Sequence, residues 1–189
     1  ELWDSGIHEA RILAGFVDDP RLVTEKQMES WARDFDSWDV CDQVCGSLFD
    51  KTPFAYEKAI EWSKRDEEFV KRAGFALMAW LPVHDKNAPD ERFLVFFPAI
   101  KEQATDERNF VKKAVNWALR QIGKRSVKLN KEAIKWAKGI DKIDSKAAHW
   151  IAKNALRELE SEKVQERIKR EKVKRTRRPP NRFALVLSF

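Results

Sequence analysis

Two segments of the chain, 41 residues apart, carry nearly the same pattern of apolar and charged residues. The segments are "EFVKRAGFALMAW" (68–80) and "NFVKKAVNWALRQ" (109–121), and their alignment pairs Phe69 with Phe110. A weaker copy follows at 147–159. Internal similarity with a period near 40 residues is typical of stacked helix pairs, in which each pair buries its apolar face against the next. The sequence therefore predicts an array of helix pairs rather than a sheet protein.

The composition and the helix boundary signals agree with such an array. Of the 189 residues, 36% are charged and only 6 are Gly and 7 are Pro, and the strict alternation of strands is rare. Helix start signals recur at short intervals, for example at Thr24, Asn130 and Ser145, while Gly123 and Gly139 are candidate C-caps. We predict eight or nine helices of roughly 10 to 17 residues joined by short turns.

Charge is distributed unevenly along the chain. Residues 1–68 have a net charge of −9, residues 69–162 have +7 and residues 163–189 have +8. A basic half suits a polyanion such as nucleic acid, although a solvated Lys-rich surface would give similar counts. We predict an all-α, HEAT-like helical-repeat superhelix (an α-α solenoid) with a concave basic face over residues 1–162. The last 27 residues are expected to form a basic helix end and a disordered tail.

Cysteine and histidine usage argues against a metal site. Cys41 and Cys45 lie one helical turn apart and are expected to be buried thiols, while His8, His84 and His149 are scattered and none lies beside the cysteines at a ligand spacing. We predict no metal and no cofactor. With no signal peptide and no apolar run of about 18 residues, the expected location is the cytoplasm, with no membrane partner.

Trp38 and Asp42 lie off the apolar stripe of their predicted helix. When residues 37–49 are placed at about 100° per residue, the apolar positions from Val40 to Leu48 form one stripe, and the pair falls together roughly 110° from its centre. One interpretation is a Trp that covers the rim of the core beside a solvated acid near a helix N-terminus. The other is a matched pair that faces a ligand.

A second helix carries an unusual line of cations around a Trp. The line runs along the predicted helix at spacings of three or four residues, has no acid in it, and consists of Lys113, Trp117, Arg120 and Lys124. Arg125 continues the basic run, and Arg72 coincides with Lys113 under the 41-residue offset. Such a surface is expected to bind phosphates and to offer aromatic faces to bases.

If Trp38, Asp42 and Trp117 line one cleft, they form an aromatic box with a single carboxylate. Such a box attracts a cation. A cationic group on DNA is a base alkylated on a ring nitrogen, which departs as a neutral molecule and needs no general acid. One carboxylate then suffices to stabilise the developing sugar cation and to orient water.

These residues resemble the bacterial DNA alkylation repair glycosylases of the AlkD type, which are built from HEAT-like repeats. The resemblance rests on "SWDVCD" (37–42), "FVKRAGF" (69–75) and "FVKKAVNWALRQIGKR" (110–125), which occur in family order. It covers most of residues 1–162, although family members usually have further N-terminal helices.

The resemblance implies a role for each matching residue. Asp42 would be the catalytic carboxylate, Trp38 and Trp117 would contact the lesion and its deoxyribose, and Arg72 and Arg120 would hold the DNA backbone. It also implies a monofunctional glycosylase with no metal, cofactor or Schiff-base lysine.

The leading hypothesis is a monomeric glycosylase that excises cationic N3- or N7-alkylated purines from double-stranded DNA and leaves an abasic site. Such an enzyme would be cytoplasmic and associated with the nucleoid when bound to DNA. The alternative is a non-catalytic helical-repeat module that binds DNA or a protein partner through the same basic face.

Overall fold

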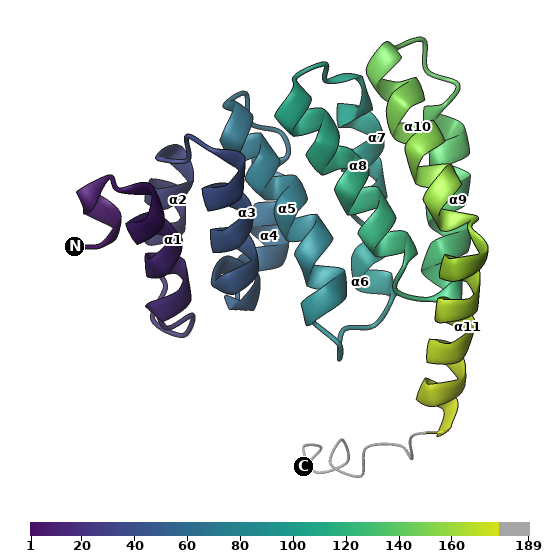
Figure 1. The fold of residues 1–189 in the computed structure, drawn as a ribbon, viewed down its shortest axis with the longest axis horizontal. Helices are drawn as coiled ribbons and strands as arrows, with labels where there is room; N and C mark the ends of the chain where they lie inside the picture. The colour runs from purple at the N-terminus through teal and green to yellow at the C-terminus, as the bar shows by residue number, and fades with distance from the viewer. Residues whose placement is uncertain (178–189) are drawn as a thin grey trace, which may run out of the picture.

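The computed structural model describes residues 1–177, with side chains through residue 170, and this part of the chain is helical without strands (Figure 1). Its α-helices are α1 (His8–Val17), α2 (Glu25–Arg33), α3 (Trp38–Ser47), α4 (Ala55–Trp62), α5 (Glu68–His84), α6 (Glu91–Leu94), α7 (Phe97–Glu102), α8 (Asn109–Gly123), α9 (Val127–Ile140), α10 (Lys146–Leu159) and α11 (Glu162–Arg177). Three short 3-10 helices are η1 (Trp3–Ser5), η2 (Phe49–Lys51) and η3 (Gln103–Thr105). The all-α prediction is confirmed.

The helices form two layers. In Figure 1, α1, α3, α5, α8 and α10 lie side by side in that order, and we call them the front layer. Behind them lie α2, α4, α7 and α9, the back layer. Helices from the two layers pack in pairs, such as α4 with α5 and α9 with α10. This is the arrangement expected of stacked helix pairs.

The internal repeat of the sequence corresponds to neighbouring helices of the front layer. Helix α5 begins at Glu68 and α8 begins at Asn109, and the two helices pack directly against each other. The equivalent residues Phe69 and Phe110 are in ring contact, with centroids 5.4 Å apart. The 41-residue offset is therefore the spacing of adjacent front-layer helices.

Of the three helix starts predicted above at Thr24, Asn130 and Ser145, two are confirmed and one is wrong. Thr24 caps α2 by accepting a hydrogen bond from the Gln27 N–H, and Ser145 caps α10 in the same way. Asn130 is not a helix start, because Ser126 caps α9 four residues earlier. Asn130 is instead buried inside α9.

The two glycines predicted as C-caps do not have that role. Gly6 is the one glycine in the described residues with a positive φ, of 68°, whereas Gly139 lies within α9. Gly123 ends α8 where helices pack closely, since a Cβ at this position would lie 2.7 Å from the Leu159 side chain. Close approach of helices, rather than a left-handed cap, explains the glycine here.

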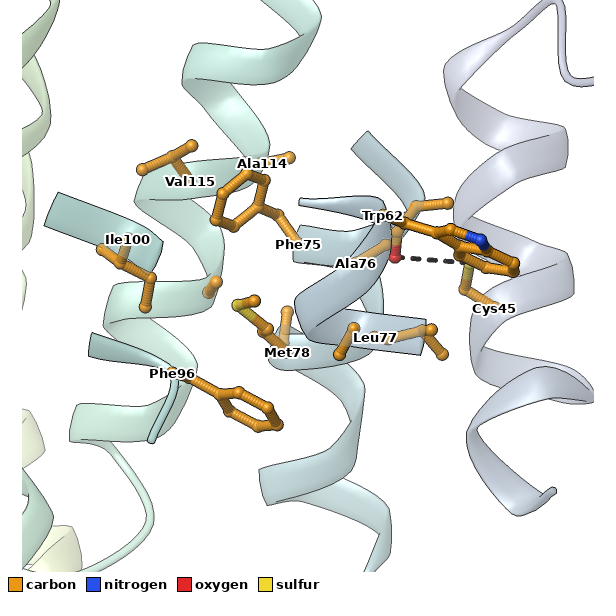
Figure 2. Close-up of a cluster of buried hydrophobic side chains, with 14 of the residues drawn as sticks. Cys45, Trp62, Phe75, Ala76, Leu77, Met78, Phe96, Ile100, Ala114 and Val115 are labelled. Carbon is orange, nitrogen blue, oxygen red and sulfur yellow. Dashed lines mark hydrogen bonds between the residues drawn. The ribbon is translucent and has the colours of Figure 1, made fainter. Parts of the chain in front are cut away.

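The core lies between the two layers and is centred on α5. Figure 2 shows Phe75 and Met78 of α5 among Trp62 of α4, Ile100 of α7 and Val115 of α8. All five side chains are completely buried. Burial of an apolar side chain of this size contributes about 1.5–3 kcal/mol, so this cluster fixes the position of α5 against its neighbours.

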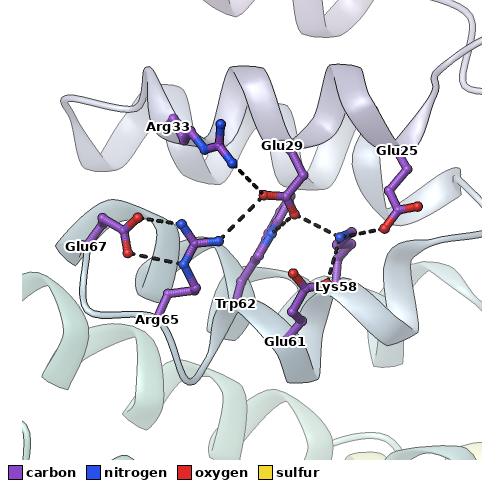
Figure 3. Close-up of polar contacts among 8 residues, drawn as sticks. All are labelled: Glu25, Glu29, Arg33, Lys58, Glu61, Trp62, Arg65 and Glu67. Carbon is purple, nitrogen blue, oxygen red and sulfur yellow. Dashed lines mark hydrogen bonds and ion pairs between the residues drawn. The ribbon is translucent and has the colours of Figure 1, made fainter.

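Ion pairs tie the back-layer helices α2 and α4 together. The Lys58 side chain is only 3% exposed and its ammonium lies 2.6–2.8 Å from carboxylate oxygens of Glu25, Glu29 and Glu61 (Figure 3). The indole N–H of Trp62 donates to the same Glu29 at 2.7 Å. A buried ammonium is tolerated here because three carboxylates surround it.

Within the front layer, side chains of one helix bind backbone carbonyls of the next. These bonds run from Cys41 to Phe69 (3.6 Å), from Cys45 to Ala73 (3.8 Å), from Arg72 to Phe110 (2.6 Å) and from Asn116 to Ile151 (2.9 Å). Both cysteines are free and buried, as predicted. These bonds hold the register between adjacent helices of the layer.

Helix α11 packs on the end of the array. Ile168 and Val164 are buried, and the Gln165 amide donates to Asn130 Oδ1 (3.0 Å) and to the Leu159 carbonyl (2.7 Å). The basic segment after residue 162 is thus helical and docked through residue 170. The disordered tail predicted further on, from residue 178, lies outside the described residues.

Candidate active site

Asp42 and Arg72 form a two-bonded ion pair on the front layer. Arg72 Nε lies 2.9 Å from Asp42 Oδ1, and Nη2 lies 2.7 Å from Oδ2. The remaining Nη1 donates to the Phe110 carbonyl oxygen of α8 at 2.6 Å. The guanidinium is therefore fixed by partners on both neighbouring helices, and it fixes the carboxylate of Asp42 in turn.

Trp38 lies beside this ion pair and is turned to solvent. Its side chain is 52% exposed, and the guanidinium carbon of Arg72 lies 6.0 Å from the centroid of its ring. The apolar stripe of α3 is completely buried at Val40 and Val44, whereas the Asp42 side chain is 15% exposed. As predicted, Trp38 and Asp42 lie outside the buried apolar stripe of α3.

The environment of Asp42 favours its protonated form more than water does. Burial raises the pKa of the Asp42 carboxyl above its ordinary value of 3.8, while hydrogen bonds and the charge of Arg72 oppose this shift. Each carboxylate oxygen accepts one N–H from Arg72 and retains further acceptor capacity. The carboxylate can therefore stabilise a second positive group at its exposed edge.

Trp80, which the sequence reasoning did not single out, joins Asp42 to Trp117. Its indole N–H donates to the backbone carbonyl of Asp42 at 3.1 Å, and its ring meets the Trp117 ring edge-on with centroids 5.3 Å apart. The indole lies against Gly46 of α3, where a Cβ would come within 2.5 Å of the ring. A Trp within an apolar run, facing a Gly on the neighbouring front-layer helix, is a signal that pairwise comparison of helices could have found.

Trp80 also stacks on a residue of a second polar pair, His84 and Asp50. The Trp80 and His84 rings are stacked with centroids 4.8 Å apart, and His84 Nδ1 is hydrogen-bonded to Asp50. Burial raises the pKa of the Asp50 carboxyl, and the hydrogen bond with His84 opposes the shift. Asp50 fixes the His84 ring by this hydrogen bond, and the His84 ring packs on the Trp80 indole.

The cations predicted around Trp117 are only partly available to a ligand. Lys113 is exposed, and Trp117 is half-buried. Arg120 and Lys124 both pair with Glu158 of α10, the latter at 2.7 Å. An anion that binds here competes with Glu158 for these two side chains.

Arg125 is not at this surface. Its side chain is 2% exposed, and its guanidinium donates to the backbone carbonyls of Pro82 at 2.7 Å and Ala88 at 2.6 Å. It also lies 3.5 Å from Asp90. Arg125 holds the connection between α5 and α6, and its position does not support the DNA-backbone contact that the sequence led us to expect.

The structure therefore brings together Trp38, Asp42 and Arg72 directly, and it connects Trp117 to them through Trp80. In the part of the chain whose side chains are described, no group of three or more His, Cys, Asp or Glu residues could hold a metal ion. No described helix is both long enough and apolar enough to cross a membrane.

Comparison with known proteins defines the class. A solved structure, described as "A new family of proteins related to the HEAT-like repeat DNA glycosylases with affinity for branched DNA structures", superimposes with a TM-score of 0.65 at 23% sequence identity, over 82% of this chain and 72% of that chain. The fold is thus that of the HEAT-like repeat DNA glycosylases and their relatives. A family model, described as "DNA alkylation repair enzyme", matches residues 1–159, and the chain belongs to this family. No curated protein sequence matches it.

Proposed function

We propose that this protein is a monofunctional DNA glycosylase that hydrolyses the N-glycosidic bond of cationic N3- or N7-alkylated purines and leaves an abasic site. The observation that carries the proposal is the Asp42 carboxylate, mostly buried beside the exposed ring of Trp38 and held through both oxygens by Arg72. Membership in the DNA alkylation repair family supports the choice of substrate.

The chemistry needs little beyond these groups. An alkylated purine carries a positive charge that an indole face attracts by about 0.5–2 kcal/mol. As the glycosidic bond breaks, the base departs neutral and positive charge develops on the sugar. The Asp42 carboxylate, at the low effective dielectric of a mostly buried position, stabilises that charge and orients the attacking water.

Duplex binding would come from the cations of the front layer. Lys113 is exposed on α8, and Arg120 and Lys124 can exchange Glu158 for phosphate oxygens. Arg72 would act indirectly, by holding Asp42. Two of its N–H groups donate to the Asp42 carboxylate and a third donates to the Phe110 carbonyl. Affinity that depends on a few phosphate contacts falls steeply as salt concentration rises.

The test is Asp42→Asn, with release of 7-methylguanine and 3-methyladenine from methylated DNA as the readout. We expect release to fall by at least 100-fold, a typical loss for removing a group that stabilises transition-state charge, while duplex affinity changes little. Asp39→Asn is the matched control, because Asp39 is one turn away and bonds to His8 instead (2.8 Å). Equal release by both variants would overturn the role of Asp42.

A non-catalytic DNA-binding module is the second candidate. Two observations favour it: the solved structure with this fold is described as having affinity for branched DNA structures, and Arg72 already neutralises the Asp42 carboxylate. In that case wild-type protein would release no base from methylated DNA, yet would bind DNA with a strong dependence on salt.

A further inference from the structure

Helix α10 exposes a line of three cations and one Trp that has no role in the site described above. Lys146, Trp150, Lys153 and Arg157 follow each other at spacings of four, three and four residues, so they share one face of the helix. All four are exposed. We call this line the α10 stripe.

The stripe faces away from the back layer. The buried residues of α10 that lie on its opposite side include Ala148, Ala152, Ala155 and Leu159, which pack towards α9 and the core. Glu158 points to α8, where it binds Arg120 and Lys124. The stripe therefore lies on the outer side of the front layer, the side on which Trp38 is exposed on α3 and Lys113 on α8.

Trp150 is not explained by packing. Its side chain is 40% exposed, whereas Trp3 and Trp62 are buried. Its ring contacts a cation, the ammonium of Lys112 on α8, which lies 5.5 Å from the ring centroid. An indole that is both exposed and flanked by cations retains a free aromatic face for a ligand.

The charges of the stripe define what kind of ligand it fits. Glu158 is the only acid of α10 and it points to α8, and none of Lys146, Lys153 and Arg157 forms an ion pair with a described side chain. From Lys146 to Arg157 the helix rises roughly 16 Å, which is about five nucleotide steps at the duplex spacing of ~3.4 Å per strand, and fewer steps of a more extended unpaired strand. A strand of that length fits the stripe in charge and in extent.

We propose that the α10 stripe binds unpaired nucleotides next to the duplex, with Lys146, Lys153 and Arg157 on the phosphates and Trp150 stacked on a base. The bases of an intact duplex are stacked on one another, so only an unpaired base presents a face to Trp150. Because α10 packs beside α8, a duplex held at Lys113 would extend over this helix. The proposal rests on the DNA-binding part of the proposed function and not on the chemistry of Asp42.

The test compares two undamaged DNA probes by fluorescence anisotropy: a 20-base-pair duplex, and the same duplex with a single-stranded extension of five nucleotides. We expect Trp150→Ala to weaken binding of the extended probe by about 5- to 100-fold, the usual loss when one base loses its aromatic partner, and to leave the plain duplex unaffected. Trp150→Phe should restore most of the preference. Equal binding of both probes by the wild-type protein would overturn the proposal.

A charge-reversal pair tests the phosphate contacts. Lys153→Glu with Arg157→Glu should weaken the extended probe and reduce the salt dependence of its binding. The control, Lys131→Glu with Lys135→Glu, makes the same change of charge at exposed positions of α9 in the back layer. Equal weakening by both pairs would mean that net charge alone matters, and would overturn the assignment of α10.

These outcomes are independent of catalysis, since neither probe contains a damaged base. If wild-type protein releases no alkylpurine but Trp150→Ala still loses its preference for the extended probe, the glycosylase proposal fails and the α10 stripe stands. If wild-type protein releases alkylpurine but shows no preference for the extended probe, the glycosylase proposal stands and the α10 stripe proposal fails.

Discussion

The indole N–H of Trp80 is hydrogen-bonded to the backbone carbonyl of Asp42, 38 positions earlier in the sequence. The same ring meets Trp117 edge-on and covers Gly46. One side chain thus sets the position of the proposed catalytic carboxylate relative to the aromatic residue of the next helix. Trp80 is a positioning residue in the proposed reaction.

Trp80→Phe removes the N–H and keeps an aromatic ring. We expect the single-turnover rate of base release to fall about fivefold, because loss of one hydrogen bond of about 1 kcal/mol loosens the Asp42 backbone, while DNA affinity stays within twofold. Trp136→Phe is the control, since Trp136 stacks on Phe97 with centroids 5.8 Å apart, in the back layer. A similar loss of rate in both variants would contradict the positioning role.

Gly46→Ala should destabilise the protein through Trp80. The added Cβ would lie 2.5 Å from the indole ring, so the ring must move, at about 1–3 kcal/mol in the free energy of unfolding. In a Trp80→Ala background the same substitution should cost much less, because no ring opposes it. Chemical denaturation of the four proteins of this double-mutant cycle measures the difference; additive effects would show that the contact does not matter.

The pH dependence of base release should follow the Asp42 carboxyl. Burial raises its pKa above 3.8, and the proposed reaction uses the charged carboxylate. The rate should therefore fall as pH drops through that raised value, earlier than for an exposed Asp. Arg72→Ala removes the opposing cation and should move this acidic limb to higher pH. An acidic limb at or below pH 3.8 in wild-type protein would contradict the effect of burial.

The raised pKa of Asp42 makes stability depend on pH in the direction opposite to activity. A carboxyl with a raised pKa in the folded state stabilises the fold more when protonated than when charged, so Asp42 itself contributes less to the free energy of unfolding above that pKa than below it. Activity and this part of the stability therefore change in opposite directions with pH.

Glu158→Gln should strengthen DNA binding. Glu158 holds both Arg120 and Lys124, and a neutral amide would release them for phosphates. We expect severalfold higher affinity for duplex DNA and a steeper dependence on salt, by about one to two phosphate contacts. Glu160→Gln, which removes the same charge beside Lys138 on α9 at 3.4 Å, should have a smaller effect; equal gains would indicate a general effect of charge.

Lys58→Met should lower the free energy of unfolding by about 1–3 kcal/mol, because the partly buried carboxylate of Glu29 loses a charged hydrogen-bond donor. Burial alone would raise the pKa of Glu29, but hydrogen bonds from Lys58 and Trp62 hold it below 4.5, so this stabilisation is lost as pH falls through the acid range. The variant should therefore lose less stability between pH 7 and pH 3 than the wild type. Arg21→Met, at an exposed pair with Asp19, should leave the free energy of unfolding almost unchanged, because solvent screens an exposed ion pair.

The sequence was sufficient for the repeat and for the faces of individual helices. The spacing of Phe69 and Phe110 identified adjacent helices, and the projection of residues 37–49 placed Trp38 and Asp42 off the core. Both inferences use periodicity within one element or between copies of it, which local sequence determines directly.

What could not be predicted depends on contacts between elements. Trp80 belongs to an apolar run, and only the packing of α5 against Gly46 turns its N–H towards Asp42. Arg125 belongs to a basic run, but the carbonyls that bind it are those of Pro82 and of Ala88 in the segment that follows. Each of these partners lies more than 30 residues away in the sequence, so the local pattern does not indicate it.

Arg72 has a mechanical consequence for the whole array. One guanidinium connects the carboxylate of Asp42 on α3 with the Phe110 carbonyl on α8, so any change in the angle between these helices must lengthen at least one of its hydrogen bonds. A change in the curvature of the array therefore also changes the orientation of the Asp42 carboxylate. A DNA molecule that flexes the array as it binds would reorient the proposed catalytic carboxylate directly, without a separate moving loop.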